Sequence, residues 1–162
     1  NTAPILSVAV PPRDAWVAQV RYRMGTRHGN TTAGITLWNG AEHGSTKQIT
    51  FGPINQKGLN IGGSYSDDCT SHATDLARHS GNSGAFSAPE GGDEGILQVV
   101  KFGSFFKFRY FDPATSTWSE LGTMETSVKD NFNRIGLTAT SWGSETTEVE
   151  FRDFTLVPGM FN

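Results

Sequence analysis

The sequence predicts an all-β protein built as a two-sheet antiparallel β-sandwich, or jelly roll. Many short segments alternate apolar and polar residues with period two, as strands with one buried face do. Turn-forming residues separate these segments at short intervals. With 19 glycines and 11 phenylalanines against 3 methionines, the composition also favours strands and tight turns over helices. A chain of 162 residues can bury a core of its own, so we expect a single sandwich domain over 1–162.

The alternation of apolar and polar residues places the individual strands. It is clearest at 16–24, where Trp16 and Val20 have the inward parity and Arg21 and Arg23 have the outward parity. The other expected strands are 5–10, 33–38, 47–54, 58–63, 95–102, 105–111, 117–121 and two strands within 131–159. Tight connections, rich in turn-forming residues, are expected at 55–57, 102–105 and 111–115.

The inward parity also predicts which side chains fill the core. Large apolar residues of the expected strands should be mostly buried, namely Trp16, Val20, Ile35, Leu37, Val100, Phe106, Phe108, Ile135, Leu137, Val149 and Phe151. Trp118 begins the strand at 117–121 and is followed by Leu121, so we expect Trp118 in the core as well.

Residues 64–94 interrupt the regular succession of strands. This segment is polar and rich in Gly, Ser and Asn, and such a composition cannot fill a core. A short helix is expected at 70–79, capped by Thr70 or Ser71. We therefore expect a long loop excursion that lies over one end or edge of the sandwich.

Two groups of side chains in this excursion have the chemistry of metal ligands. On a helix, His72, Asp75 and His79 would lie on one side, and His and Asp suit zinc. The alternative is a structural calcium site, whose candidate ligands are the carboxylates of Asp67, Asp68, Asp93 and Glu94. The calcium candidates lack the spacing of an EF-hand loop, and we expect no cofactor.

Charge and cysteine content exclude several classes of function. The net charge of −3 gives no basis for binding nucleic acid or an anionic membrane, and the apolar runs are too short to cross a bilayer. Cys69 is the only cysteine in the sequence, so the chain forms no internal disulfide and a bystander thiol is expected. No signal-peptide pattern opens the sequence. The expected partners therefore include neither nucleic acid nor a membrane.

The outward parity of several strands predicts a polar sheet face with aromatic residues at its rim. Residues of this parity are Arg21, Arg23, Thr36, Trp38, Lys107, Arg109, Thr138, Thr140, Trp142, Glu148 and Glu150. Aromatic rings bury the C–H surface of a sugar, and planar bidentate groups match its adjacent hydroxyls. The expected ligand-binding residues are the stacking Trp38 and Trp142 and the polar Arg21, Arg23, Arg109 and Glu148. The alternative is an ordinary solvated face with weak cross-strand Arg–Glu pairs.

Glu148 and Glu150 form a carboxylate pair two residues apart on one strand. Their Cα atoms would lie roughly 6.5–7 Å apart, within the roughly 5–9.5 Å that separates the two acids of a glycosidase. A solvated strand edge is the alternative. We predict no catalytic residue, because the sequence also lacks a nucleophile elbow, a phosphate-binding loop and a dinucleotide fingerprint.

Several stretches together carry a resemblance to a known family. They are WVAQVR at 16–21, AGITLW at 33–38, FKFRY at 106–110 with the turn to Trp118, IGLTA at 135–139 and VEFRDF at 149–154. In these stretches the chain is similar to the concanavalin A-like lectin/glucanase superfamily, and more narrowly to laminin-G-like accessory domains found beside bacterial glycoside hydrolases. The resemblance implies a jelly roll with ligands on the concave sheet or at the loop rim. Glucanases of the superfamily carry a third acid where this chain has Arg152, a departure that argues against catalysis.

These features predict a non-catalytic carbohydrate-binding domain, an accessory module of a secreted polysaccharide-degrading enzyme. The expected partners are an oligo- or polysaccharide and other domains of a larger enzyme, and the expected location is extracellular. The arginines of the outward row favour an acidic or richly hydroxylated sugar. Two alternatives stay open. One is a small glycoside hydrolase or lyase that uses Glu148 and Glu150, and the other is a protein-interaction β-sandwich whose polar face is a docking surface.

Overall fold

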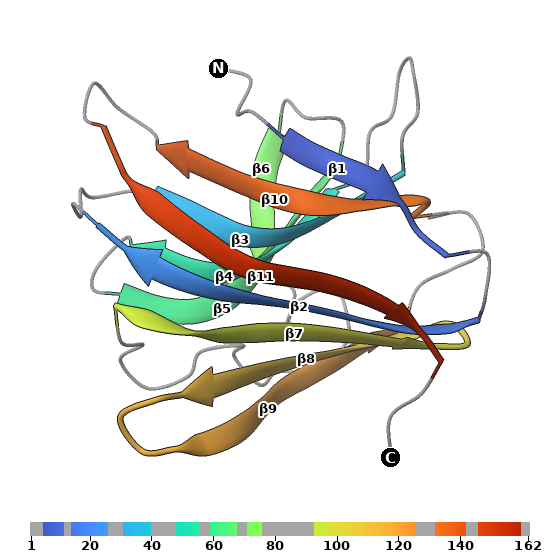
Figure 1. Cartoon of the computed structure of the whole chain (residues 1–162). Coiled ribbons are helices and arrows are strands. Elements are labelled where there is room, and N and C mark those ends of the chain that lie inside the picture. Colours follow the sequence, from blue (N-terminus) through green and yellow to red (C-terminus); the bar gives the residue numbers. More distant parts are fainter. Residues whose placement is uncertain are drawn as a thin grey trace.

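The computed structural model contains eleven strands among the residues that it describes (Figure 1). The described residues are 5–11, 14–25, 31–39, 48–55, 59–67, 71–75, 93–125, 132–141 and 146–159. In chain order the strands are β1 (Ile5–Ala9), β2 (Ala15–Met24), β3 (Thr31–Trp38), β4 (Gln48–Asn55), β5 (Leu59–Asp67), β6 (Ser71–Asp75), β7 (Glu94–Phe102), β8 (Phe105–Asp112), β9 (Thr117–Glu125), β10 (Arg134–Ser141) and β11 (Val149–Pro158). Every strand predicted from the sequence is present, with ends that differ by a few residues.

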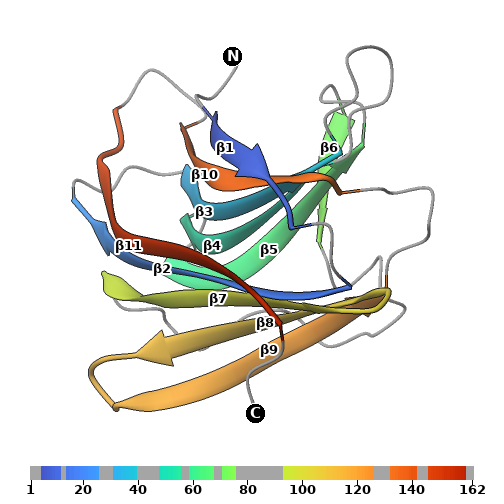
Figure 2. The ribbon, with the colours of Figure 1, turned by 45° about the vertical axis from the view of Figure 1, so that its right-hand side comes forward.

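The strands form two antiparallel sheets. Sheet A has the order β1-β10-β3-β4-β5-β6, and sheet B has the order β11-β2-β7-β8-β9. Figures 1 and 2 show the two sheets as layers, with β1 and β10 at one end of the molecule and β8 and β9 at the other. The predicted antiparallel β-sandwich is therefore confirmed. The described part of the chain contains no helix that could span a membrane.

The core lies between the two sheets and is filled by their inward-facing side chains. In β2, every second residue from Trp16 to Met24 is buried, as the period of a strand requires. The ring of Phe51 in sheet A lies 5.2 Å from the ring of Phe108 in sheet B, and Trp16 lies 5.8 Å from Phe106 within sheet B. Burying one such side chain stabilises the fold by about 1.5–3 kcal/mol. The contact between Phe51 and Phe108 thus joins the two layers.

Most of the side chains predicted to fill the core do so. Those buried are Trp16, Val20, Ile35, Leu37, Phe106, Phe108 and Ile135, and those partly buried against them are Leu137, Val149 and Phe151. The predictions for two other residues are wrong. Val100 is only half-buried and faces outward beside its partner Lys107, and the side chain of Trp118 is 38% exposed.

A β-bulge explains why Trp118 lies outside the core. In the pairing of β9 with β8, Gly122 pairs with Phe108 and Glu120 pairs with Arg109, so the residue between them is an extra one. An extra residue reverses the alternation of side chains along a strand. Two even-numbered residues on either side of it, such as Trp118 and Met124, then point to opposite faces of the sheet. Met124 is accordingly buried in the core, whereas Trp118 faces out from sheet B.

The prediction for 64–94 is partly wrong. β5 continues to Asp67, and Ser71–Asp75 forms strand β6 instead of the helix expected at 70–79. The helix that would have placed His72 and Asp75 on one side is therefore not formed over Ser71–Asp75. His79 and Asp68 lie outside the described residues, as do 76–92. Among the described residues, no group of three or more His, Cys, Asp or Glu side chains could hold a metal ion.

Two tyrosines occupy the end of the core next to the last residues of β2. The rings of Tyr22 and Tyr110 lie 6.5 Å apart, and the Tyr110 hydroxyl donates a hydrogen bond to the carbonyl oxygen of Glu94 at 3.3 Å. Burial raises the pKa of Tyr22 far above its usual range, and the neighbouring Tyr110 raises it further. The Tyr22 hydroxyl therefore stays neutral and adds no charge to the adjacent surface.

Candidate functional site

The residues of the predicted polar row lie on two opposite faces of the sandwich. Strand parity tells whether a side chain points away from the core, but it does not tell to which sheet the strand belongs. Those on β3 and β10 of sheet A are Thr36, Trp38, Thr138 and Thr140, and those on sheet B are Arg21, Arg23, Lys107, Arg109 and Glu150. The prediction that all of them line one sheet is therefore wrong.

Trp38 lies on the outer face of sheet A, between Arg134 of β10 and Gln48 of β4. Its side chain is half-buried, and its indole nitrogen is buried without a hydrogen-bond partner. The hydroxyl of Thr36, two residues earlier on the same strand, is also buried without a partner. Arg134 is engaged by Ser7, with Nε donating to the serine hydroxyl at 3.0 Å. Trp38 therefore does not present a widely exposed ring to an approaching ligand.

A row of amide and guanidinium groups crosses the outer face of sheet B. Gln98 on β7 donates a hydrogen bond from Nε2 to Oε1 of Gln19 on β2 at 3.0 Å. Arg109 on β8 donates from Nη1 to Oε1 of Gln98 at 2.8 Å. We call these three residues the amide row. Because each hydrogen bond fixes the plane of its neighbour, the row is preorganised for a ligand that lies over it.

Trp118 on β9 lies beside Arg109 at one end of the amide row. The Cζ atom of Arg109 lies 4.8 Å from the centroid of the indole ring, and the ring of Phe111 lies 5.4 Å from it. A cation–π contact of this kind contributes about 0.5–1 kcal/mol at an exposed site. Two neighbours thus hold the indole in place while 38% of the Trp118 surface stays open to solvent.

Several cations of sheet B have carboxylate partners. Lys107 Nζ lies 3.1 Å from Glu120 Oε2, and Arg21 Nε lies 3.5 Å from Asp153 Oδ2. Ion pairs as exposed as these contribute little to folding stability. They do, however, reduce the positive field that a free row of Arg and Lys would present to a ligand.

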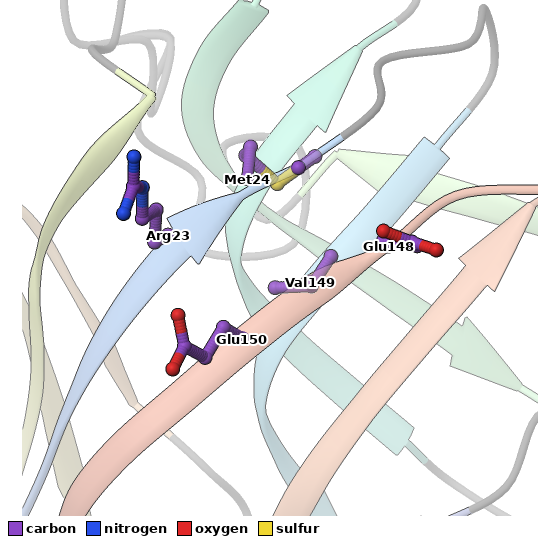
Figure 3. Close-up of a pocket in the computed structure, with 6 residues that line it drawn as sticks. Arg23, Met24, Glu148, Val149 and Glu150 are labelled. Atoms are coloured by element: carbon purple, nitrogen blue, oxygen red, sulfur yellow. The ribbon is translucent and has the colours of Figure 1, made fainter.

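A pocket of about 490 Å³ lies where β2 ends and β11 begins (Figure 3). Its lining comprises Arg23, Met24, Gly25, Glu148, Val149 and Glu150. In Figure 3 the Glu148 and Glu150 side chains lie on either side of Val149 and point away from each other. Glu150 Oε1 also accepts a hydrogen bond from Nε of Arg152 at 2.6 Å. The two carboxylates therefore do not converge on one point, as the acid and the nucleophile of a glycosidase must.

The residues predicted to bind a ligand are only partly brought together. Arg21, Arg23 and Arg109 all lie on strands of sheet B with outward parity, and Glu148 lines the same pocket as Arg23. Trp38 lies on the opposite face of the sandwich, and Trp142 lies outside the described residues.

Sequence reasoning missed Trp118 and the two glutamines of the amide row. One signal was present in the sequence. Glu120 follows Trp118 by two residues on the same strand, and a charged side chain in a sheet normally faces solvent, so Trp118 should share that face. Gln19 and Gln98 carry no comparable signal, because their hydrogen bond depends on the pairing of β2 with β7.

Comparison with known proteins identifies solved structures of the same fold. The sequence matches no family profile and no curated protein. The GH43 protein BlXynB from Bacillus licheniformis superimposes with a TM-score of 0.65 at 14% identity, over 92% of this chain and 28% of that one. A functionally unknown protein from Saccharomyces cerevisiae gives a TM-score of 0.59 at 12% identity, over 97% of this chain and 74% of that one.

A third solved structure is the CBM2 module of the evolved Dit protein of Lactobacillus casei BL23 phage J-1. It gives a TM-score of 0.52 at 14% identity, over 96% of this chain and 70% of that one. At identities this low, the likeness shows the two-sheet fold alone. The chain spans little more than a quarter of the Bacillus protein, so the activity of that whole protein does not transfer to it.

Proposed function

We propose that this chain is a non-catalytic carbohydrate-binding domain that binds an oligo- or polysaccharide on the outer face of sheet B. The observation that carries the proposal is the exposed Trp118 indole beside the amide row, with Arg109 in contact with both. An exposed aromatic ring next to fixed planar hydrogen-bonding groups is the combination that sugar recognition needs.

Each part of the site has a chemical role in this proposal. The indole of Trp118 stacks on the C–H face of a pyranose ring and removes its apolar surface from water. Gln19 and Gln98 each present an amide, and Arg109 presents a guanidinium, so neighbouring hydroxyls can be bound in pairs. Arg21 and Arg23 follow Gln19 on the same face of β2 and supply further donors beyond the row.

The absence of catalysis is part of the same proposal. A glycosidase needs one carboxyl group that gives up a proton and a second that attacks or activates water, both aimed at the same bond. Glu148 and Glu150 point away from each other, and Arg152 donates a hydrogen bond to Glu150. This geometry supports binding without cleavage.

The biological context that we propose is an accessory module of a secreted polysaccharide-degrading enzyme, located outside the cell. This is supported by the fold shared with part of a GH43 chain and by the sequence resemblance to laminin-G-like accessory domains of the concanavalin A-like superfamily. In such a setting the module holds the enzyme on its polymer, while another domain carries out the chemistry.

A second candidate function is protein interaction, and the edge strand β1 favours it. Leu6 is 78% exposed and Val8 is 48% exposed on this strand, which lies at the edge of sheet A. Unpaired edges with apolar side chains are places where other chains bind. This surface is distinct from the amide row, so the two functions can be tested separately.

The experiment that tests the proposal measures retention and cleavage on the same polysaccharides. The domain is run through native gels that contain soluble xylan, arabinan, mixed-linkage glucan or polygalacturonate, and pelleted with insoluble cellulose. We expect retention on at least one polymer and no new reducing ends after long incubation. Reducing-end release would contradict the non-catalytic assignment, and an absence of retention on every polymer would contradict carbohydrate binding and favour the edge-strand function.

A further inference from the structure

A second pair of aromatic rings lies on the outer face of sheet B, far along β8 from Trp118. Phe102 and Phe105 flank the β7–β8 turn, with their rings 5.5 Å apart and only 17° from parallel. Phe105 is 36% exposed, close to the value for Trp118. We call Phe102 with Phe105 the turn platform, and Phe111 with Trp118 the indole platform.

The two platforms face the same way. Phe105 and Phe111 are six residues apart on β8, and an even spacing places both on one face of the strand. The contacts agree with this placement, because Lys107 Nζ lies 6.0 Å from the Phe102 ring and Arg109 lies over Trp118. At about 3.3 Å per residue, the platforms are separated by roughly 20 Å along the strand.

The surface between the platforms is polar, and its two cations, Lys107 and Arg109, are both already engaged by neighbouring side chains. Lys107 pairs with Glu120 at 3.1 Å, and Arg109 donates its hydrogen bond to Gln98 at 2.8 Å. An anionic sugar would have to compete with Glu120 for the ammonium group of Lys107. A sugar that offers only hydroxyls can instead accept and donate hydrogen bonds without breaking that pair. The pairing of Lys107 with Glu120 therefore opposes the acidic sugar that the arginines of the sequence favour.

We propose that this face binds an internal segment of an extended, uncharged glycan chain that runs along β8 and contacts both platforms. The inference rests on the proposed function and specifies its substrate class. A chain end or a disaccharide reaches only one platform, whereas a longer oligosaccharide bridges the polar centre and stacks at both ends. Affinity should therefore depend strongly on chain length, because the second contact is made within an already bound ligand.

The test is calorimetry with a series of oligosaccharides, from disaccharide to hexasaccharide, prepared from whichever polymer the domain retains. We expect affinity to increase with length until both platforms are spanned. Phe105→Ala should weaken hexasaccharide binding about tenfold and leave disaccharide binding unchanged, while Trp118→Ala weakens both. Phe105→Trp, which keeps a flat ring, should retain the long-chain affinity.

The possible failures of the two proposals are distinguishable. If affinity reaches its plateau at the disaccharide, or if Phe105→Ala leaves hexasaccharide binding unchanged, the extended-chain inference is wrong although the proposed function stands. Tighter binding of polygalacturonate oligomers than of neutral ones would overturn the uncharged class. If the wild-type domain binds no oligosaccharide of the series and no polymer of the panel, the proposed function itself fails. Circular dichroism of each variant checks that the fold is kept.

Discussion

Replacing Phe108 with alanine is expected to lower the free energy of unfolding by about 3–5 kcal/mol, the usual cost of removing a fully buried phenylalanine. Phe108 has no exposed surface, and its ring contacts Phe51 of the facing sheet at 5.2 Å. The truncation leaves a cavity between the two sheets that rigid strands cannot close. Urea unfolding followed by circular dichroism measures the change.

Phe105→Ala is the matched control for this prediction. The residue type and the strand are the same, but Phe105 faces outward and is 36% exposed. Its replacement should change the free energy of unfolding by less than about 1 kcal/mol. Equal losses for the two variants would mean that β8 does not have the assigned inner and outer faces.

Replacing Trp118 with alanine is expected to weaken binding of the retained glycan about thirtyfold, which corresponds to about 2 kcal/mol for the loss of an aromatic anchor. The indole is the largest exposed ring of the described surface of sheet B, and Arg109 would lose its cation–π contact at the same time. Calorimetry with the hexasaccharide measures the change, and the unfolding midpoint should move little because Trp118 lies outside the core.

Trp38→Ala provides the comparison for the Trp118 variant. It removes the same side chain from the outer face of the other sheet. We expect the affinity to stay unchanged in this variant. A thirtyfold loss with Trp38→Ala and none with Trp118→Ala would move the site to sheet A.

The strands and the core could be predicted because they depend on local alternation. In β2 the period of two places Trp16 and Val20 inside and Arg21 and Arg23 outside, and the structure agrees at each position. The expectation for Trp118 was wrong because it relied on Leu121, which is the extra residue of a β-bulge in β9, and a bulge depends on the partner strand.

The candidate site could be predicted only in part, because it depends on which strands are neighbours. Arg109 was expected to face outward, and it does. Its partners Gln98 and Trp118 come from the flanking strands β7 and β9, and no local pattern shows which side chains will lie opposite. The same limit applies to Trp38. It points away from the core as expected, but its strand belongs to sheet A, so it lies on the opposite side of the sandwich from Arg109.

We propose that the glycan binds to the outer face of sheet B, around Trp118. The most direct measurement is a nitrogen–proton correlation spectrum of the labelled domain during titration with the hexasaccharide, because each of the four tryptophans gives its own indole signal. We expect the Trp118 indole and the Arg109 Nε signals to shift together, while the signals of the buried Trp16 and of Trp38 stay in place. A shift of the Trp38 or Trp142 indole with an unmoved Trp118 signal would contradict this proposal.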